Sequence, residues 1–229
     1  MVTARKPARN APVTASSTVA IEPERIKEMT RKVTKKISAV PKSPISARAI
    51  THAAEKMIKE TEAAKAAGDS IGGTLETAVC GLEAGLGEPW FDSIESELAH
   101  ILFSIPAVKG VEFGEGFAMA DKTGSEANDE PCIKDGRISM RSNNGGGADG
   151  GITNGMPLLF RTAVKPTPSI AMKQNTVDLG KGEETTVEIK GRHDPAIVHR
   201  AAPVVNAAAA LVIADFIARR FGYMALRNE

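Results

Sequence analysis

The feature that most restricts how this 229-residue chain can fold is an apolar segment near its C-terminus. Residues 203–221 have the spacing of one long helix, with a proline in the first turn and Gly222 just past the end. Between residues 204 and 217 only Asn206 and Asp215 are polar. A helix that is apolar on most sides has to be covered on most sides. We therefore expect this helix to be buried on most sides.

The sequence before this helix predicts a mixture of helices and strands. Helical periodicity marks residues 43–68, with Ser43 as the N-terminal cap, and a capping-box pair of Asp92 and Glu95 opens a second helix that runs to Ser104. Alternating or β-rich stretches predict strands at 74–81, 108–117, 158–164 and 185–190. These elements make a mixed α and β chain with long glycine-rich loops between them.

Two stretches have compositions unlike the rest. Residues 1–21 are basic, contain no acidic residue and show no hydrophobic periodicity, which predicts disorder; a transit peptide has a similar composition. Residues 121–155 are polar and rich in glycine, and a loop of that length is either functional or disordered. We expect a disordered or poorly matched extension over 1–40 and one domain over 41–229.

Composition argues against several classes of protein. A net charge of +1 and only 4% aromatic residues argue against binding to nucleic acid or to a membrane surface. The sequence has no run of about 18 apolar residues, so it predicts no transmembrane helix. Cys80 and Cys132, like the four histidines, lack the spacing of metal ligands, so we expect no metal and a reducing compartment, the cytoplasm; a plastid is the alternative if 1–21 is a transit peptide.

Two glycine-rich segments allow close approach of the backbone to a ligand. In Gly68–Gly73 (GDSIGG), Asp69 and Ser70 are able to cap or bind, although an ordinary helix-to-strand turn is the simpler interpretation. The second is 141–151 (RSNNGGGADGG), whose backbone N–H groups suit an anion or a planar cofactor. It lacks the residues of a Walker loop and the context of a dinucleotide fingerprint, and a flexible linker remains the alternative.

Two further segments carry charged groups beside prolines. Lys165–Ser169 (KPTPS) has the stiffness and the donors of a phosphate clamp, but a proline turn with a solvated lysine fits equally well. Gly191–Pro195 (GRHDP) combines an anion-binding guanidinium with two titratable groups. A surface charge cluster is the alternative for the second segment, because His and Asp need a cleft to gain useful pKa values.

In this order, the segments resemble the C-terminal half of the chorismate synthase family. The resemblance runs from about residue 41 to 221 and is carried by eight stretches: GDSIGG (68–73), GLGEPWFD (85–92), SIPAVKGVEFGEGF (104–117), GSEANDE (124–130), RSNNGGGADGGITNGMP (141–157), KPTPSI (165–170), QNTVDL (174–179) and GRHDPAIVHRAAPVV (191–205).

The resemblance implies a lyase of the shikimate pathway. Its substrate would be 5-enolpyruvylshikimate 3-phosphate, converted to chorismate and phosphate by 1,4-anti elimination. The cofactor would be reduced FMN, with NADPH as the electron source. The implied fold is α+β, a layered β-α-α-β sandwich that is incomplete here, and the implied assembly is a homotetramer.

The resemblance also assigns site residues. It implies Asp194 as the acid–base residue near the flavin, and Arg192 as a cation beside both FMN and the substrate. The remaining residues that it implies for the flavin are Pro106, Ala107, Gly150, Lys165, Pro166, Thr167, Pro168 and Ser169.

Three motifs that the resemblance places in the N-terminal half are not found in the sequence: GxSHG, a GRPGHAD-like segment and RSSARET. In the family they carry two catalytic histidines and several arginines that bind substrate anions. We therefore expect a half-built site, and the alternative to an enzyme is an inactive fragment or a flavin-binding remnant. We also expect exposed apolar faces, and hence self-association or a partner that supplies the N-terminal half.

Overall fold

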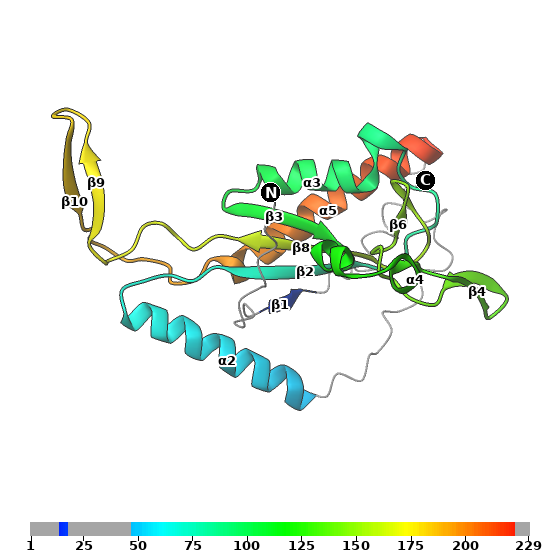
Figure 1. Cartoon of the computed structure of the whole chain (residues 1–229), viewed down its shortest axis with the longest axis horizontal. Coiled ribbons are helices and arrows are strands. Elements are labelled where there is room, and N and C mark those ends of the chain that lie inside the picture. The colour runs from blue at the N-terminus through cyan, green and yellow to red at the C-terminus, as the bar shows by residue number, and fades with distance from the viewer. Residues whose placement is uncertain (1–13, 18–46, 223–229) are drawn as a thin grey trace, which may run out of the picture.

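The computed structural model describes residues 14–17 and 47–222, and its centre is a four-stranded sheet (Figure 1). The strand order is β1-β2-β8-β3. β1 is parallel to β2, whereas β8 is antiparallel to both β2 and β3. The bounds are β1 (Thr14–Ser17), β2 (Gly73–Val79), β3 (Val108–Phe113) and β8 (Leu158–Val164).

Two helices cover one face of this sheet. α3 (Ile94–Ser104) contacts β3, α5 (Val198–Phe221) contacts β2, and the two helices contact each other. The strands expose one face to these helices because their apolar residues alternate with polar ones. In β8, for example, Leu158, Phe160 and Val164 are buried. The predicted α+β class is confirmed.

α5 begins five residues earlier than the sequence predicts, so the expectation that Pro203 lies in the first turn is wrong. The N–H groups of Arg200 and Ala201 bond to the carbonyl of Ile197, which opens the helix ahead of the proline. Pro203 lies inside the helix, where its nitrogen donates no hydrogen bond to the carbonyl of His199 and its ring crowds that carbonyl.

The outer surfaces of α5 and α3 carry apolar side chains that the described residues leave uncovered. Val204 and Leu211 of α5 are 48% and 65% exposed, and Phe103 of α3 is 54% exposed. By length and composition alone α5 would also pass as a membrane span, but a core helix passes the same test, and the opposite side of α5 lines the core. We call Phe103, Val204, Ala207 and Leu211 the open helix face.

The two other predicted helix boundaries are partly right. α2 (Ala47–Ala66) ends near Gly68 as expected, at a φ of 70°, while the predicted start at Ser43 lies outside the described residues. α3 is capped by Ser93, whose hydroxyl accepts from the N–H of Ser96, and not by an Asp92–Glu95 box. Asp92 instead ends the short η1 helix (Trp90–Asp92).

The polar region 114–157 is ordered by short elements that the sequence does not predict. β3 ends at Phe113, four residues early, because Gly114 and Gly116 turn the chain with φ values of 56°. The elements that follow are η2 (Gly116–Asp121), α4 (Gly124–Ala127), the hairpin of β4 (Pro131–Lys134) and β5 (Arg137–Met140), and the hairpin of β6 (Ala148–Asp149) and β7 (Ile152–Thr153).

Two more strand predictions need correction. The predicted strand 185–190 is observed as β10 (Glu183–Val187), which pairs with an unpredicted strand, β9 (Gln174–Asp178). This hairpin projects away from the sheet (Figure 1). Disorder over residues 1–21 is wrong for β1, which forms a parallel ladder with β2 from Thr14↔Thr74 to Ser17↔Thr77.

Candidate functional site

Four segments that are distant in sequence meet at one end of the sheet. There β2 begins at Gly73, β8 ends at Val164 and β3 begins at Val108, and the register pairs Val164 with both other residues. We call this the Val164 end, and the opposite end, where β8 begins, the Leu158 end. The segments that reach the Val164 end are the turn 68–73, residues 105–107, the loop 165–171 and residues 194–196.

Ala107 lies at the Val164 end in a conformation that is rare for a residue with a side chain. Its φ is 75°, and non-glycine residues with positive φ are uncommon. Its carbonyl accepts a 2.9 Å hydrogen bond from the N–H of Lys165. The predicted flavin-side residues Pro106 and Ala107 are therefore tied to the start of the predicted Lys165–Ser169 loop.

The Lys165–Ser169 loop presents one cation and two hydroxyls. The Lys165 side chain is exposed, whereas Thr167 and Ser169 are half-buried. The Thr167 carbonyl accepts a 2.6 Å hydrogen bond from the hydroxyl of Ser70. The hydroxyl oxygen of Thr167 itself is buried, and among the described residues it has no hydrogen-bond partner. A buried polar atom without a partner calls for an explanation, and a bound ligand or water is one.

The segment with Arg192 and Asp194 is fixed at the same end by its backbone. The carbonyl of Pro195 accepts a 2.8 Å hydrogen bond from the N–H of Ile71, and Ile71 pairs with Ala196 in a parallel bridge. Arg192 is exposed, and Asp194 is half-buried.

Asp194 has a charged partner that the sequence does not predict. Arg200, in the first turn of α5, forms an ion pair with its carboxylate. The neighbouring His193 ring is held by a 2.9 Å contact between its Nε2 and the carbonyl of Ile189. The local sequence gives no signal for the Asp194–Arg200 pair, because it depends on where the helix begins.

Gly150 does not lie with the other predicted flavin residues. The carbonyl of the next residue, Gly151, accepts a 2.9 Å hydrogen bond from the N–H of Ile94. Ile94 is the first residue of α3, and this part of α3 lies at the Leu158 end. The seven residues of β8, roughly 20 Å at about 3.3 Å per residue, separate this end from Lys165. Gly150 has a φ of 60°, and a Cβ there would meet nothing within 4 Å.

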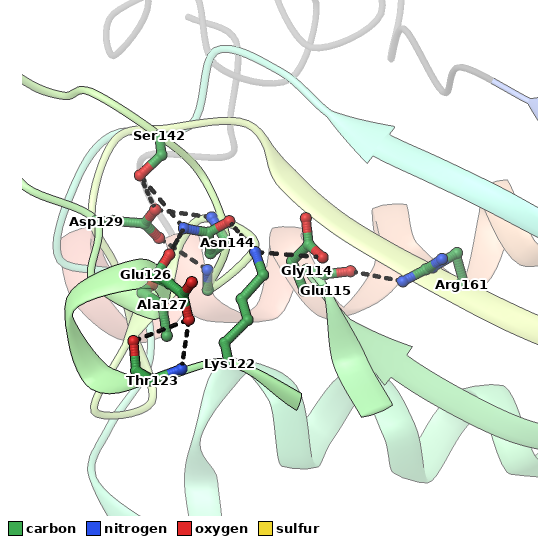
Figure 2. A network of polar contacts seen from close by, with 11 residues as sticks. Gly114, Glu115, Lys122, Thr123, Glu126, Ala127, Asp129, Ser142, Asn144 and Arg161 are labelled. Carbon is green, nitrogen blue, oxygen red and sulfur yellow. Dashed lines mark hydrogen bonds and ion pairs between the residues drawn. The ribbon is translucent and has the colours of Figure 1, made fainter. Parts of the chain in front are cut away.

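A polar network that the sequence does not predict organises the region beside the Leu158 end (Figure 2). Both oxygens of the Asp129 carboxylate accept hydrogen bonds, from the hydroxyl of Ser142 and the N–H groups of Asn144 and Gly145. Partial burial acts to raise the pKa of Asp129, but these hydrogen bonds outweigh it and leave that pKa lowered.

The network extends from Asp129 to the sheet. Lys122 donates a 3.0 Å hydrogen bond to the side-chain oxygen of Asn144 and lies 3.5 Å from the Glu115 carboxylate. Arg161 of β8 donates to the carbonyl of Gly114 and pairs with Glu112 on β3 at 3.0 Å. These contacts hold the glycine-rich segment against the edge of the sheet, and they are structural.

No candidate metal centre accompanies these sites. Within the described ranges 14–17 and 47–222, no three His, Cys, Asp or Glu side chains gather closely enough to hold a metal ion. Burial raises the pKa of the Cys80 thiol, which disfavours the thiolate that a metal or an electrophile would need.

Comparison with known proteins identifies the family. The mixed helix-and-sheet fold is that of a lyase family: the family model for chorismate synthase matches residues 5–218. Chorismate synthase of Thermococcus kodakarensis is 52% identical over 166 residues, which are 72% of this chain and 47% of that protein. The chain belongs to the chorismate synthase family.

Two further comparisons agree with this result. Chorismate synthase of Methanosarcina barkeri is 52% identical over 180 residues, or 79% of this chain and 49% of that protein. A crystal structure of chorismate synthase superposes with a TM-score of 0.58 at 33% identity, covering 73% of this chain and 43% of the other. The chain thus spans about half the length of the curated relatives that it matches.

Proposed function

We propose that this chain supplies the flavin-side half of a chorismate synthase. The complete reaction would convert 5-enolpyruvylshikimate 3-phosphate to chorismate and phosphate by 1,4-anti elimination with reduced FMN. The observation that carries the proposal is the meeting of Ala107, Lys165 and the backbone beside Asp194 at the Val164 end. Two of the three predicted flavin-side clusters and the predicted acid–base segment share that end of the sheet.

The residues at this end fit FMN. The buried hydroxyl of Thr167 lacks a partner among the described residues, and Lys165 and Arg192 offer exposed cations to a flavin or substrate anion. When bound, reduced FMN would supply electron density to the departing phosphate. Lys165, Thr167 and Ser169 would hold it along the loop, with Pro106 and Ala107 on the neighbouring segment.

The proposed roles of the charged residues follow from their positions. Arg192 would bind a phosphate or carboxylate of the substrate, for which its planar guanidinium is suited. Asp194 would exchange a proton at its carboxylate, and its ion pair with Arg200 fixes the direction of that carboxylate. Closing this end against water would strengthen both interactions.

The described chain does not complete this site. Gly150 lies at the Leu158 end, so it would reach the same flavin only if the surrounding protein brings the two ends together. The histidine and arginine motifs that the resemblance places in the N-terminal half are not in the sequence. We therefore expect the chain alone to form no chorismate, and the alternative function is an inactive, flavin-binding remnant of the family.

The partner that we propose is the other half of the fold or further copies of this chain. The open helix face is apolar, and a helical layer packed on it would complete a β-α-α-β sandwich. The resemblance that the motifs carry implies a homotetramer. With a net charge of +1, we propose no nucleic-acid or membrane partner, and with archaeal relatives we propose a cytoplasmic location over a plastid.

The deciding experiment measures flavin binding and turnover separately. The purified chain is titrated with FMN, and chorismate is then assayed anaerobically with reduced FMN and 5-enolpyruvylshikimate 3-phosphate. We expect FMN binding that weakens in Lys165→Ala but not in Lys181→Ala, a control lysine in the exposed β9–β10 hairpin. Wild-type chain that does not bind FMN would contradict the flavin-side assignment. Turnover well above the protein-free blank would contradict the incomplete site.

A further inference from the structure

The turn Gly68–Gly73 holds the loop that follows β8 at several points. Its central contact is the hydrogen bond from the Ser70 hydroxyl to the Thr167 carbonyl, 2.6 Å long and spanning 97 residues of sequence. Both residues are half-buried, which partly shields this bond from water. The sequence alone favours an ordinary helix-to-strand turn here, and the structure adds a long-range contact to it.

The glycines of the turn make two more contacts with the same loop. A Cβ on Gly72 would lie 2.5 Å from the carbonyl oxygen of Val164 and 3.0 Å from the Pro166 ring, so only glycine allows this approach. At the other end of the turn, the Gly68 carbonyl accepts a 2.9 Å hydrogen bond from the N–H of Ala171. The turn therefore contacts the loop at its start, middle and end.

The loop needs donors from outside because of its prolines. Pro166 and Pro168 have no N–H, so neither residue is able to donate a hydrogen bond within the loop. The Thr167 carbonyl lies between them. Its bond from Ser70 is the contact that fixes the middle of the loop, with a longer 3.3 Å bond from the Gln174 side chain to the Pro168 carbonyl beside it.

The same turn also fixes the segment that carries Arg192 and Asp194. Ile71, next to Ser70, donates to the Pro195 carbonyl at 2.8 Å and forms the parallel bridge with Ala196. Successive residues of one turn thus contact both segments that face the proposed ligand. The spacing between those segments is set by the turn.

We propose that Ser70 is a positioning residue, whose hydroxyl holds Thr167 so that the Lys165–Ser169 loop keeps the shape that receives its ligand. The inference rests on the proposed function for the identity of that ligand, FMN. The buried hydroxyl of Thr167, which has no partner in the part of the chain that the structure describes, supports it, because that oxygen belongs to the same residue whose carbonyl Ser70 holds.

The test compares Ser70→Ala with Ser70→Thr, which keeps a hydroxyl. The control is Ser104→Ala, because Ser104 makes a hydroxyl-to-carbonyl bond of the same 2.6 Å length, but within α3, to Ile101. Hydrogen exchange of the ligand-free chain is read at the amides of Lys165 and Ala171, which mark the two ends of the loop. FMN affinity and thermal unfolding are measured on the same proteins.

We expect Ser70→Ala to speed exchange at both amides and to weaken FMN binding, each by about tenfold, the effect of one lost hydrogen bond. Ser70→Thr should restore both, and Ser104→Ala should change neither. Unchanged exchange in Ser70→Ala would overturn the proposal. So would FMN affinity that is unchanged in Ser70→Ala when the wild-type chain binds FMN.

The two proposals fail in different ways. If the wild-type chain does not bind FMN, the proposed function fails, and the exchange rates of Ser70→Ala and Ser70→Thr still decide whether Ser70 positions the loop. If the wild-type chain binds FMN and neither Ser70 variant differs from it in exchange, the function stands and the positioning role is wrong.

Discussion

Asp129 and Ser142, thirteen residues apart, are joined by a 2.5 Å hydrogen bond from the hydroxyl to the carboxylate. The same carboxylate accepts bonds of 2.8 Å from the N–H groups of Asn144 and Gly145. One side chain therefore fixes the first residues of the glycine-rich segment and joins it to the end of α4 (Figure 2).

Replacing Asp129 with asparagine should destabilise the chain. An amide has only one accepting oxygen, and its NH₂ group would face either the N–H of Gly145 or the donors on Ser142 and Asn144. We expect a loss of about 1–2 kcal/mol in the free energy of unfolding, because charge-assisted hydrogen bonds are stronger than neutral ones. Denaturant unfolding measures it. Asp121→Asn, at an exposed carboxylate on η2, is the control and should change the free energy by less than about 0.5 kcal/mol.

The contribution of Asp129 should depend on pH in one direction. The pKa of Asp129 is lowered in the folded chain from its ordinary 3.8, so the unfolded chain takes up this proton at higher pH than the folded one. The stabilisation is complete above the unfolded value and is lost as pH falls through the folded value, below about pH 4. Unfolding free energies between pH 3 and 6 should converge for wild type and Asp129→Asn at the acidic end. A constant gap across that range would contradict the linkage.

Glu95 should behave in the opposite way. Burial raises the pKa of Glu95, and the nearby Asp149 carboxylate raises it further, so the ionised form is disfavoured in the folded chain. Stability from this group is present below its ordinary value of 4.5 and falls as pH rises through the folded value. Glu95→Gln should therefore stabilise the chain at pH 7, by less than about 1 kcal/mol because the site is partly solvated. Thermal unfolding at pH 7 and pH 4 checks that this gain shrinks in acid.

Sequence patterns predict the elements that bury an apolar face. β8 is found at 158–164 as expected, and α3 ends at Ser104 as expected, because both alternate apolar and polar residues with the period of their structure. β9 is missed because its residues, QNTVD, are polar and lie outside the core. β1, with the sequence TASS, is found only through its pairing with β2.

The candidate site was predictable in its segments but not in its contacts. The motif around Lys165 and the one around Arg192 are visible as local patterns of charge and proline. Ser70 and Arg200 act through partners that folding brings near, Thr167 across 97 residues and Asp194 around the start of a helix. The position of Gly150 at the far end likewise depends on the strand between, which no motif reveals.

Gly150 and Gly151 form a matched pair for testing the glycine-rich segment. Both have positive φ, 60° and 88°, so alanine is strained at either, by roughly 1 kcal/mol. A Cβ on Gly150 meets nothing, whereas one on Gly151 would lie 2.6 Å from the Ser93 Cβ and 2.7 Å from the Glu88 carbonyl oxygen. Gly151→Ala should cost about 3 kcal/mol or more, measured by unfolding. Because Gly150→Ala keeps the fold, a loss of FMN affinity in that variant would report contact with the flavin.

The open helix face should drive association of the isolated chain. Leu211 and Val204 lie on one side of α5, and Phe103 is exposed on α3, the helix that contacts α5. Exposed apolar surface of this kind marks a contact site. We expect the wild-type chain to elute as a concentration-dependent oligomer in size-exclusion chromatography with light scattering. Leu211→Lys should shift it toward monomer, because a charge buried in such a contact is strongly unfavourable.

A second exposed leucine distinguishes association through the open helix face from non-specific aggregation. Leu179, 91% exposed beside the β9–β10 hairpin, is replaced by lysine as the control. If association depends on the open helix face, Leu179→Lys should associate like wild type while Leu211→Lys does not. Equal effects of both substitutions would point to non-specific aggregation, and a wild-type chain that stays monomeric over a hundredfold range of concentration would remove the need for any covering layer. Co-expression with an N-terminal half of a relative would then be expected to give no complex through this face.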